Sequence, residues 1–185
     1  MYFTKSVELG SEAAGDIDHL SREGYSLLGW SLDENATTNS FASNGTFKCP
    51  NRIDNLDIYA IWKKSAIDKF YWYTNDAEDA TYIAEGEPIA NLKFSAWNRL
   101  KMTIEKLYRN LSLDLPDDYS TIRVTSGNTI SAKDFNGIRS AISSLPNSGT
   151  VPNKVKEDDI IGASLFVGDK SLKSALNKAI DAWNN

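Results

Sequence analysis

Residues 24–62 decide how the front of the chain folds, and they contain two apolar runs, GYSLLGWS at 24–31 and LDIYAIW at 56–62. Apolar residues occupy both alternating sets of positions in each run: Tyr25, Leu27, Leu28 and Trp30 in the first, and Leu56, Ile58, Tyr59, Ala60, Ile61 and Trp62 in the second. Successive side chains of a strand point to opposite faces, so each run predicts a strand that is apolar on both faces. Leu27 and Trp30 are expected on opposite faces.

A polar stretch separates the two predicted strands. Residues 33–43 are rich in Asp, Asn, Thr and Ser, which is typical of a loop, and Asn44-Gly45 follows directly. An Asn-Gly pair favours a tight turn because both of its central positions need positive φ. The sequence therefore predicts two strands of one sheet that bracket an exposed loop and a turn.

The two runs carry a resemblance to a known family. Gly24-Tyr25-x-Leu27-Leu28-Gly29-Trp30-Ser31, a Thr-rich loop and Leu56-x-Ile58-Tyr59-Ala60-x-Trp62-Lys63 resemble the Listeria/Bacteroides repeat, the internalin-type B-repeat. The resemblance covers residues 1–64, although Gly10 stands alone where the family has a doubled glycine. It implies a small β-grasp module of the kind found on bacterial surface proteins and phage-encoded proteins, where such modules are spacers or adhesive units and not enzymes.

Composition narrows the classes of function. The net charge of −5, with no basic stripe along the chain, argues against nucleic-acid binding, which needs a clustered basic surface. No window approaches eighteen apolar residues, so we expect no membrane insertion. The N-terminus, Met1-Tyr2-Phe3-Thr4-Lys5-Ser6, lacks a basic region followed by an apolar segment. If Met1 is the native start, this predicts a protein without a signal peptide, made in the cytoplasm of the host.

The sequence offers little for catalysis. Its one histidine is His19 and its one cysteine is Cys49, and no nucleophile elbow, glycine-rich phosphate loop or metal-ligand spacing occurs. The adjacent carboxylates at 117–118 and 158–159 could support glycoside cleavage, but such pairs near prolines are typical of solvated turns. We therefore expect no enzymatic activity, no cofactor and no metal site.

The elements expected next along the chain are short. Residues 1–8 predict a first strand, residues 11–22 a short helix or irregular crossover, and residues 65–69 a linker. The aromatic run at 70–73 and the segment 81–84 predict two strands around an acidic turn. Exposed rings could stack on sugars, but alternation favours Phe70 and Trp72 in a core, with Tyr71 and Tyr73 at an interface or the surface.

The second half contains a weak internal repeat beginning at Leu92, Ile130 and Ile161. In each copy an aliphatic residue precedes an aromatic residue by five positions, and the first two copies share the pattern aromatic-Asn-x-aliphatic. This spacing is typical of helix entry and predicts three amphipathic helices. Ser131 with Asp134 predicts a capping box, Gly162 a cap for the third helix, and Asn91 or Ser95 a substitute for the poor cap Lys93. Residues 119–124 could add a strand.

A second resemblance covers residues 68–185. Phe70-Tyr71-Trp72, Trp97-Asn98-Arg99-Leu100 and Ile130-Ser131-Ala132-x-x-Phe135-Asn136 are similar to segments of uncharacterised virion structural proteins of tailed phages and prophages of Firmicutes-type bacteria. Lys93 departs from the small hydroxyl residue usual at that position. The resemblance implies a tail, fibre or head-decoration component.

Together these observations predict an α+β chain: a β-grasp-like module at 1–64, a linker at 65–69, and a docking region at 70–185 with a strand pair and three helices. We expect a non-enzymatic virion protein, or alternatively a fragment of a bacterial surface adhesin. Its partners would be other virion proteins, further copies of itself, and a host surface protein or glycan. The residues expected for surface recognition are Asn35, Thr37, Thr38 and Asn39, and those for assembly are Tyr71, Tyr73, Trp97, Phe135 and Phe166.

Overall fold

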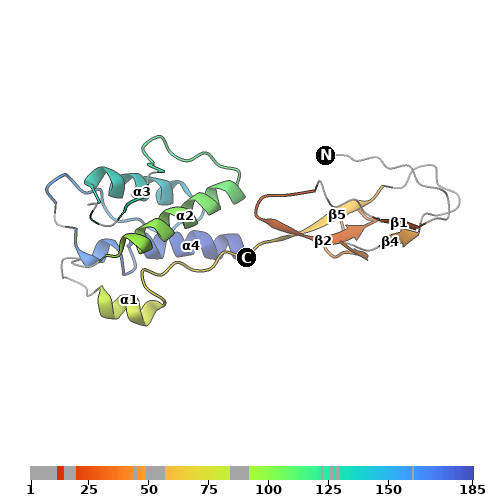
Figure 1. Ribbon diagram of the computed structural model, residues 1–185, viewed down its shortest axis with the longest axis horizontal. Helices are drawn as coiled ribbons and strands as arrows, with labels where there is room; N and C mark the ends of the chain where they lie inside the picture. The colour runs from red at the N-terminus through yellow and green to blue at the C-terminus, as the bar shows by residue number, and fades with distance from the viewer. Residues whose placement is uncertain are drawn as a thin grey trace. The chain divides into compact units, whose positions relative to one another are not determined.

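The computed structural model describes residues 12–14, 20–43, 46–48, 57–83, 92–121, 123–125, 127, 130–159 and 161–185. The chain forms two compact units, a sheet unit at Met1–Ser65 and a helical unit at Ala66–Asn185. The described residues hold a three-stranded antiparallel sheet, a separate strand pair and four α-helices (Figure 1), which confirms the expected α+β class.

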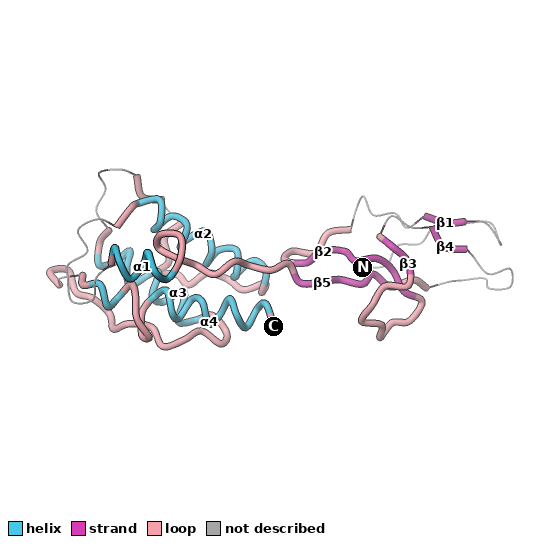
Figure 2. The backbone as a smooth tube through the Cα atoms, turned by 90° about the horizontal axis from the view of Figure 1, so that it is seen from below, coloured by secondary structure: helices cyan, strands magenta, loops and turns pink. Residues whose placement is uncertain are grey.

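The sheet unit contains both strands predicted from its apolar runs. β2 (Tyr25–Ser31) lies at the centre of the three-stranded sheet, between β3 (Phe41–Ala42) and β5 (Tyr59–Lys64) (Figure 2). β1 (Glu12–Ala14) pairs with β4 (Thr46–Lys48), and every pairing is antiparallel. The prediction of a helix or irregular crossover at 11–22 is therefore wrong at β1.

A bulge in β2 overturns the predicted division of its faces. Leu27 pairs with Trp62 and Gly29 with Ile61, so Leu28 is an extra residue without a partner in β5. One inserted residue shifts the alternation by one position, which places Leu27 and Trp30 on the same face and not on opposite faces. Leu28 is correspondingly exposed, whereas Trp30 is buried.

Several expectations for this unit lie outside the described residues. They are the strand at 1–8, the Asn44-Gly45 turn, and the positions of His19 and Cys49.

The helical unit contains α1 (Asp76–Tyr82), α2 (Phe94–Asn110), α3 (Ala132–Ser144), the 3₁₀ turn η1 (Ala163–Leu165) and α4 (Leu172–Asn184). The prediction of two strands between 70 and 84 is wrong, because residues 76–82 are helical. Asn75 caps α1 by accepting a hydrogen bond from the backbone N–H of Glu78. Acidic residues in the first turn stabilise the helix, because they interact favourably with the positive end of its dipole.

The three amphipathic helices predicted from the repeat are present, but their starts differ from expectation. Ser131 and Asp134 form the predicted capping box of α3. Lys93 is the N-cap of α2 and makes no side-chain cap hydrogen bond, Ser95 lies inside the helix, and Asn91 is outside the described residues. In the third copy, Gly162 precedes only the 3₁₀ turn, and α4 starts later, capped by Ser171.

Aromatic rings and aliphatic side chains form the core of the helical unit. The rings of Phe70 and Trp72 meet edge to face with centroids 4.8 Å apart, Trp72 meets Phe166 at 5.1 Å, and Phe166 meets Phe135 at 5.9 Å. Each of the three long helices adds buried aliphatic residues at helical spacing: Leu100, Ile104 and Leu107 from α2, Ile138 and Ile142 from α3, and Leu172, Leu176 and Ile180 from α4. This packing holds the surface features of the unit in fixed positions.

Candidate functional site

Three extended segments, here called straps, lie against the three long helices. Strap 1 (residues 66–73) lies beside α4, strap 2 (residues 123–125) beside α2, and strap 3 (residues 152–156) beside α3. Figure 1 shows strap 1 running beside α4 towards α1. The predicted strand at 119–124 is not formed in its described residues, because the backbone of strap 2 bonds to a helix side chain instead of another strand.

Asparagine side chains fix every strap in the same way. In each case the amide Nδ2 donates to the carbonyl of one strap residue while Oδ1 accepts from the N–H of that same residue, over 2.7–3.1 Å. The four pairs are Asn184 with Ile67, Asn177 with Phe70, Asn98 with Val124, and Asn136 with Val155. A side-chain amide thus supplies the donor and acceptor that a neighbouring strand would otherwise provide.

Each pair of hydrogen bonds between an asparagine and a strap residue is here called a clamp. Two of the clamps, at Asn98 and Asn136, explain the internal repeat. In Trp97-Asn98 and Phe135-Asn136 the ring is buried in the core while the next residue reaches the strap. The aromatic-Asn pattern marks these positions in the sequence, although the sequence does not reveal which segment each asparagine holds.

The spacing of the two clamps on α4 matches the dimensions of a helix and an extended chain. Asn177 and Asn184 are seven residues apart, which is about 10.5 Å along a helix axis. Their partners Phe70 and Ile67 are three residues apart, about 10 Å in an extended chain. Strap 1 runs antiparallel to α4, so both clamps can close together.

The predicted linker at 65–69 is therefore wrong for most of its length. Ile67 is buried, and both of its backbone polar groups bond to Asn184. Lys69 also forms an ion pair with Asp181 of α4, at 3.1 Å. These contacts with α4 make residues 66–69 part of the helical unit.

A buried ion pair joins α1 to α4 beside strap 1. Asp79 is fully buried and accepts hydrogen bonds from the backbone N–H groups of Trp72 and Tyr73 and from Nζ of Lys173, the last at 2.7 Å. Burial lowers the pKa of Lys173, but its hydrogen bonds to Asp79 and Asp76 outweigh burial, so the pKa lies above its ordinary value. The cluster thus ties α1 and strap 1 to α4.

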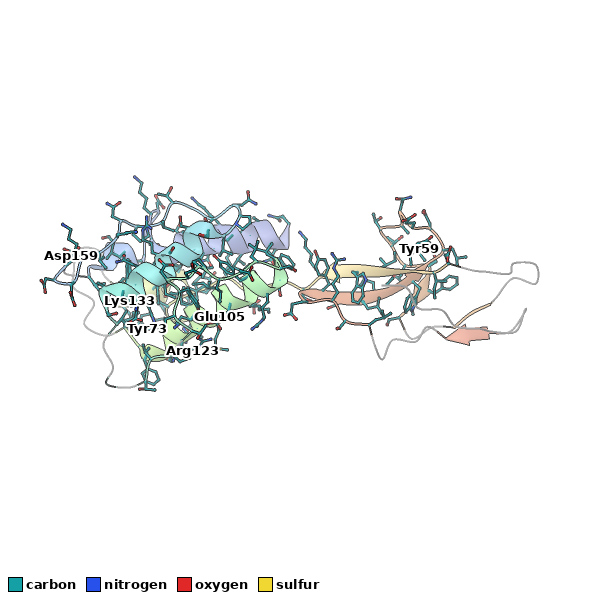
Figure 3. The ribbon with its side chains drawn as sticks, turned by 90° about the horizontal axis from the view of Figure 1, so that it is seen from above. Tyr59, Tyr73, Glu105, Arg123, Lys133 and Asp159 are labelled. Atoms are coloured by element: carbon teal, nitrogen blue, oxygen red, sulfur yellow. The ribbon has the colours of Figure 1, made fainter. Side chains whose placement is uncertain are left out.

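A second charged cluster fixes the chain near strap 2. Glu105 of α2 accepts hydrogen bonds from the hydroxyl of Tyr119, at 2.8 Å, and from both terminal nitrogens of Arg123 (Figure 3). Burial would raise the pKa of Glu105, but the hydrogen bonds from Arg123 and Tyr119 and the nearby positive charges lower it overall. Burial together with the Glu105 carboxylate raises the pKa of Tyr119 far above its ordinary value. These contacts hold residues 119–123 against α2.

The residues predicted for assembly divide into two groups. Trp97, Phe135 and Phe166 are almost completely buried, so the expectation that they form an assembly surface is wrong for all three. Their rings pack inside the unit itself, where a partner cannot reach them. Tyr71 and Tyr73 keep part of their surface exposed and lie on strap 1.

The residues predicted for recognition all lie on the exposed loop between β2 and β3. Asn35, Thr37, Thr38 and Asn39 are exposed, but Asn39 also braces the loop by donating from Nδ2 to the carbonyl of Phe41, at 3.1 Å. Asp33 accepts a hydrogen bond from the backbone N–H of Asn35 at 2.9 Å, which closes a local turn. The loop therefore presents its side chains from a hydrogen-bonded frame.

Gly29 lies at the base of this loop, where β3 approaches β2 closely. A side chain there would place its Cβ 2.0 Å from the carbonyl oxygen of Phe41 and 2.8 Å from Nδ2 of Asn39. The φ of Gly29 is 151°, a conformation that residues with a side chain rarely adopt. The glycine of the sequence signature thus permits the bulge and the close approach of β3.

The described surface of the helical unit includes two shallow depressions. One, of about 480 Å³, lies at the start of α3 and includes Lys133, Lys156 and Asp159 (Figure 3), and the other, of about 360 Å³, lies beside α4 and includes Asp76 and Lys173. Within the described residues, no group of three or more His, Cys, Asp and Glu side chains could hold a metal ion. None of the helices in that part of the chain is long and apolar enough to cross a membrane.

Comparison with known proteins returned no match of this chain to a family model, to a curated protein or to a solved structure.

Proposed function

We propose that this chain is a non-enzymatic structural protein of a tailed-phage virion, a tail, fibre or head-decoration component. Its helical unit docks on the particle, beside other virion proteins and further copies of itself. Its sheet unit is a β-grasp-like module that projects as a spacer or as a binder of a host surface protein or glycan.

One observation carries the proposal: polar side chains of the helical unit hold its straps and helices together. Asn177, Lys173 and Glu105 each bond to a neighbouring segment within the helical unit. A unit built in this way is a rigid body with a fixed surface, which suits assembly.

The sheet unit supports the β-grasp relationship through its signature residues. Gly24 has a φ of 76° and its carbonyl accepts from the N–H of Ser65, Gly29 allows the bulge, and Trp30 is buried with its Nε1 donating to the carbonyl of Ser43. The resemblance to a B-repeat rests on these same positions, so they favour a bacterial adhesin fragment as the second candidate.

Mass spectrometry of particles tests the proposal directly. Virions from the lysate of the strain encoding this chain are purified on a density gradient, and each fraction is analysed for its peptides and those of the major capsid protein. The proposal requires the two to co-purify at a fixed ratio. Recovery of the chain only in cell-wall fractions would favour the adhesin, and recovery only in the soluble lysate would exclude both.

A binding assay tests the role of the exposed loop. The full chain is incubated with purified envelopes of the host, beside a triple variant in which Asn35, Thr37 and Thr38 are changed to alanine while Asn39 keeps its bracing role. Retention that falls at least tenfold in the triple variant would assign host binding to the loop. Equal retention of the two, or none of either, would leave the sheet unit as a spacer.

A further inference from the structure

The covalent connection between the two units is very short. Ser65 closes the sheet unit, because its N–H donates to the carbonyl of Gly24 at 2.8 Å. Two positions later, both backbone polar groups of Ile67 bond to the side chain of Asn184. Only Ala66, which is exposed, stands between these two anchored residues in the chain. Tension that the sheet unit passes along the chain is therefore applied first to strap 1.

The contacts between strap 1 and α4, here called the joint, follow one face of the helix. They join three pairs of residues: Ile67 with Asn184, Lys69 with Asp181, and Phe70 with Asn177. The three partners on α4 are spaced by three and four residues, as residues on one face of a helix are. The strap therefore starts at the C-terminal end of α4 and runs towards its N-terminal end.

Buried side chains hold the strap as well. Ile67, Phe70 and Trp72 are each at most 4% exposed, and Trp72 donates from Nε1 to the carbonyl of Phe166 at 2.8 Å. To slide the strap along α4, a force must break both clamps and withdraw these side chains from the core at the same time. To peel the strap from its first residue, a force has to break only the clamp at Ile67 before it reaches the next one.

From this arrangement we propose that the joint is a mechanical device, which passes tension from the sheet unit into α4 and resists it by shear. Bonds that are loaded in parallel must break together, which raises the barrier to forced unfolding, whereas bonds that are loaded in series break one after another. The proposal rests on the proposed function for the source of the tension, namely a particle that holds the helical unit and a host surface that holds the sheet unit. The resistance itself is a property of the helical unit.

The clamp on strap 2 provides a matched comparison. Asn98 makes the same two hydrogen bonds to Val124 that Asn177 makes to Phe70. Strap 2 is not the segment that connects the helical unit to the sheet unit. Loss of either amide removes two hydrogen bonds, but only loss of Asn177 weakens the joint. A mechanical role is thus separable from an ordinary contribution to stability.

Pulling single molecules of the full chain with optical tweezers tests the proposal. Two engineered cysteines in a Cys49→Ser background carry the handles, and one of them is always Lys63→Cys, at an exposed position just before the strap. Its combination with Lys170→Cys loads the joint along the helix axis, because this exposed position precedes the N-terminal end of α4. Its combination with Asn185→Cys peels the strap from the C-terminal end. We expect the force of first rupture to be at least twofold higher in the first geometry.

Two clamp variants complete the test in the first geometry. Asn177→Ala should lower the rupture force at least twofold, and Asn98→Ala should leave it unchanged. Equal forces in the two geometries of the chain with both clamps intact would overturn the proposal. So would an unchanged force in Asn177→Ala, or a fall in Asn98→Ala as large as that in Asn177→Ala, because the force would then report only overall stability. None of these results bears on co-purification with particles, so failure here is distinct from failure of the proposed function.

Discussion

The side-chain amide of Asn177 in α4 holds both backbone polar groups of Phe70, accepting from its N–H at 2.7 Å and donating to its carbonyl at 2.9 Å. The two residues are 107 positions apart in the chain. Through this contact and its counterpart at Asn184, the last helix of the chain holds the first segment of the helical unit.

Replacing Asn177 by alanine is expected to destabilise the helical unit by about 1–3 kcal/mol, because two hydrogen bonds to part-buried backbone groups are lost. Hydrogen exchange at the Phe70 amide should quicken accordingly. Asn185→Ala is the matched control, since Asn185 is exposed and bonds to α4 through its backbone. Unchanged exchange at Phe70 in Asn177→Ala would show that the clamp contributes nothing.

Gly29→Ala is expected to destabilise the sheet unit by about 3 kcal/mol or more, because the new Cβ would collide with the carbonyl of Phe41 at a φ that favours glycine. Trp30 is buried and its Nε1–H donates to the carbonyl of Ser43, so the NMR resonance of that N–H is a local reporter of unfolding. Gly162→Ala, where an added Cβ meets no atom within 4 Å, should change stability little. If the two variants unfold at the same urea concentration, the close approach of β2 and β3 does not constrain position 29.

Lys173→Met is expected to cost about 3–5 kcal/mol, because it leaves the fully buried carboxylate of Asp79 without its cationic partner. Lys69→Met removes an exposed ion pair with Asp181 and should cost less than about 1 kcal/mol. Urea titration of both variants gives the comparison. A loss for Lys173→Met no larger than that for Lys69→Met would contradict the unpaired charge as its cause.

Glu105→Gln should make the chain less stable at neutral pH, by about 1–3 kcal/mol, because charge-assisted hydrogen bonds from Arg123 and Tyr119 are weakened. The folded pKa of Glu105 lies below its ordinary value of 4.5, so its stabilising contribution is complete above that value and is lost as pH falls through the folded pKa. The melting temperatures of Glu105→Gln and the native chain should therefore converge below pH 4.5. Glu157→Gln, at an exposed position, is the control. A difference that stays constant down to acid pH would refute the linkage.

Lys93→Asp should stabilise α2 by about 0.5–2 kcal/mol, because the N-cap position has extended backbone angles but no side-chain acceptor for the free N–H groups of the first turn. Ser131→Ala, which breaks the capping box of α3, should cost a similar amount. Thermal unfolding followed by circular dichroism measures both changes. A lower melting temperature for Lys93→Asp would mean that the Lys93 contact with Tyr73 outweighs the cap.

Local features of this fold could be predicted because they depend on residues a few positions apart. The apolar runs gave β2 and β5, helical spacing gave the amphipathic helices, and Ser131 with Asp134 gave a cap. The aromatic run at 70–73 was misassigned because alternation in four residues is too short to separate a strand from an extended strap. The burial of Trp97, Phe135 and Phe166 could not be predicted, because a sequence does not show which elements cover the apolar side of a helix.

The sequence by itself determined the α+β class, the strands β2 and β5, and the repeated aromatic-Asn pattern of α2 and α3, since periodicity and capping act over one or two turns of chain. Only the tertiary structure decided the bulge at Leu28, the straps and β3, which shows that the expectation of a loop over all of 33–43 is wrong at residues 41–42. Those features depend on which distant segments meet, as when Ile67 bonds to Asn184 across 117 positions. Such contacts form through packing and backbone hydrogen bonds, which leave little trace in local sequence.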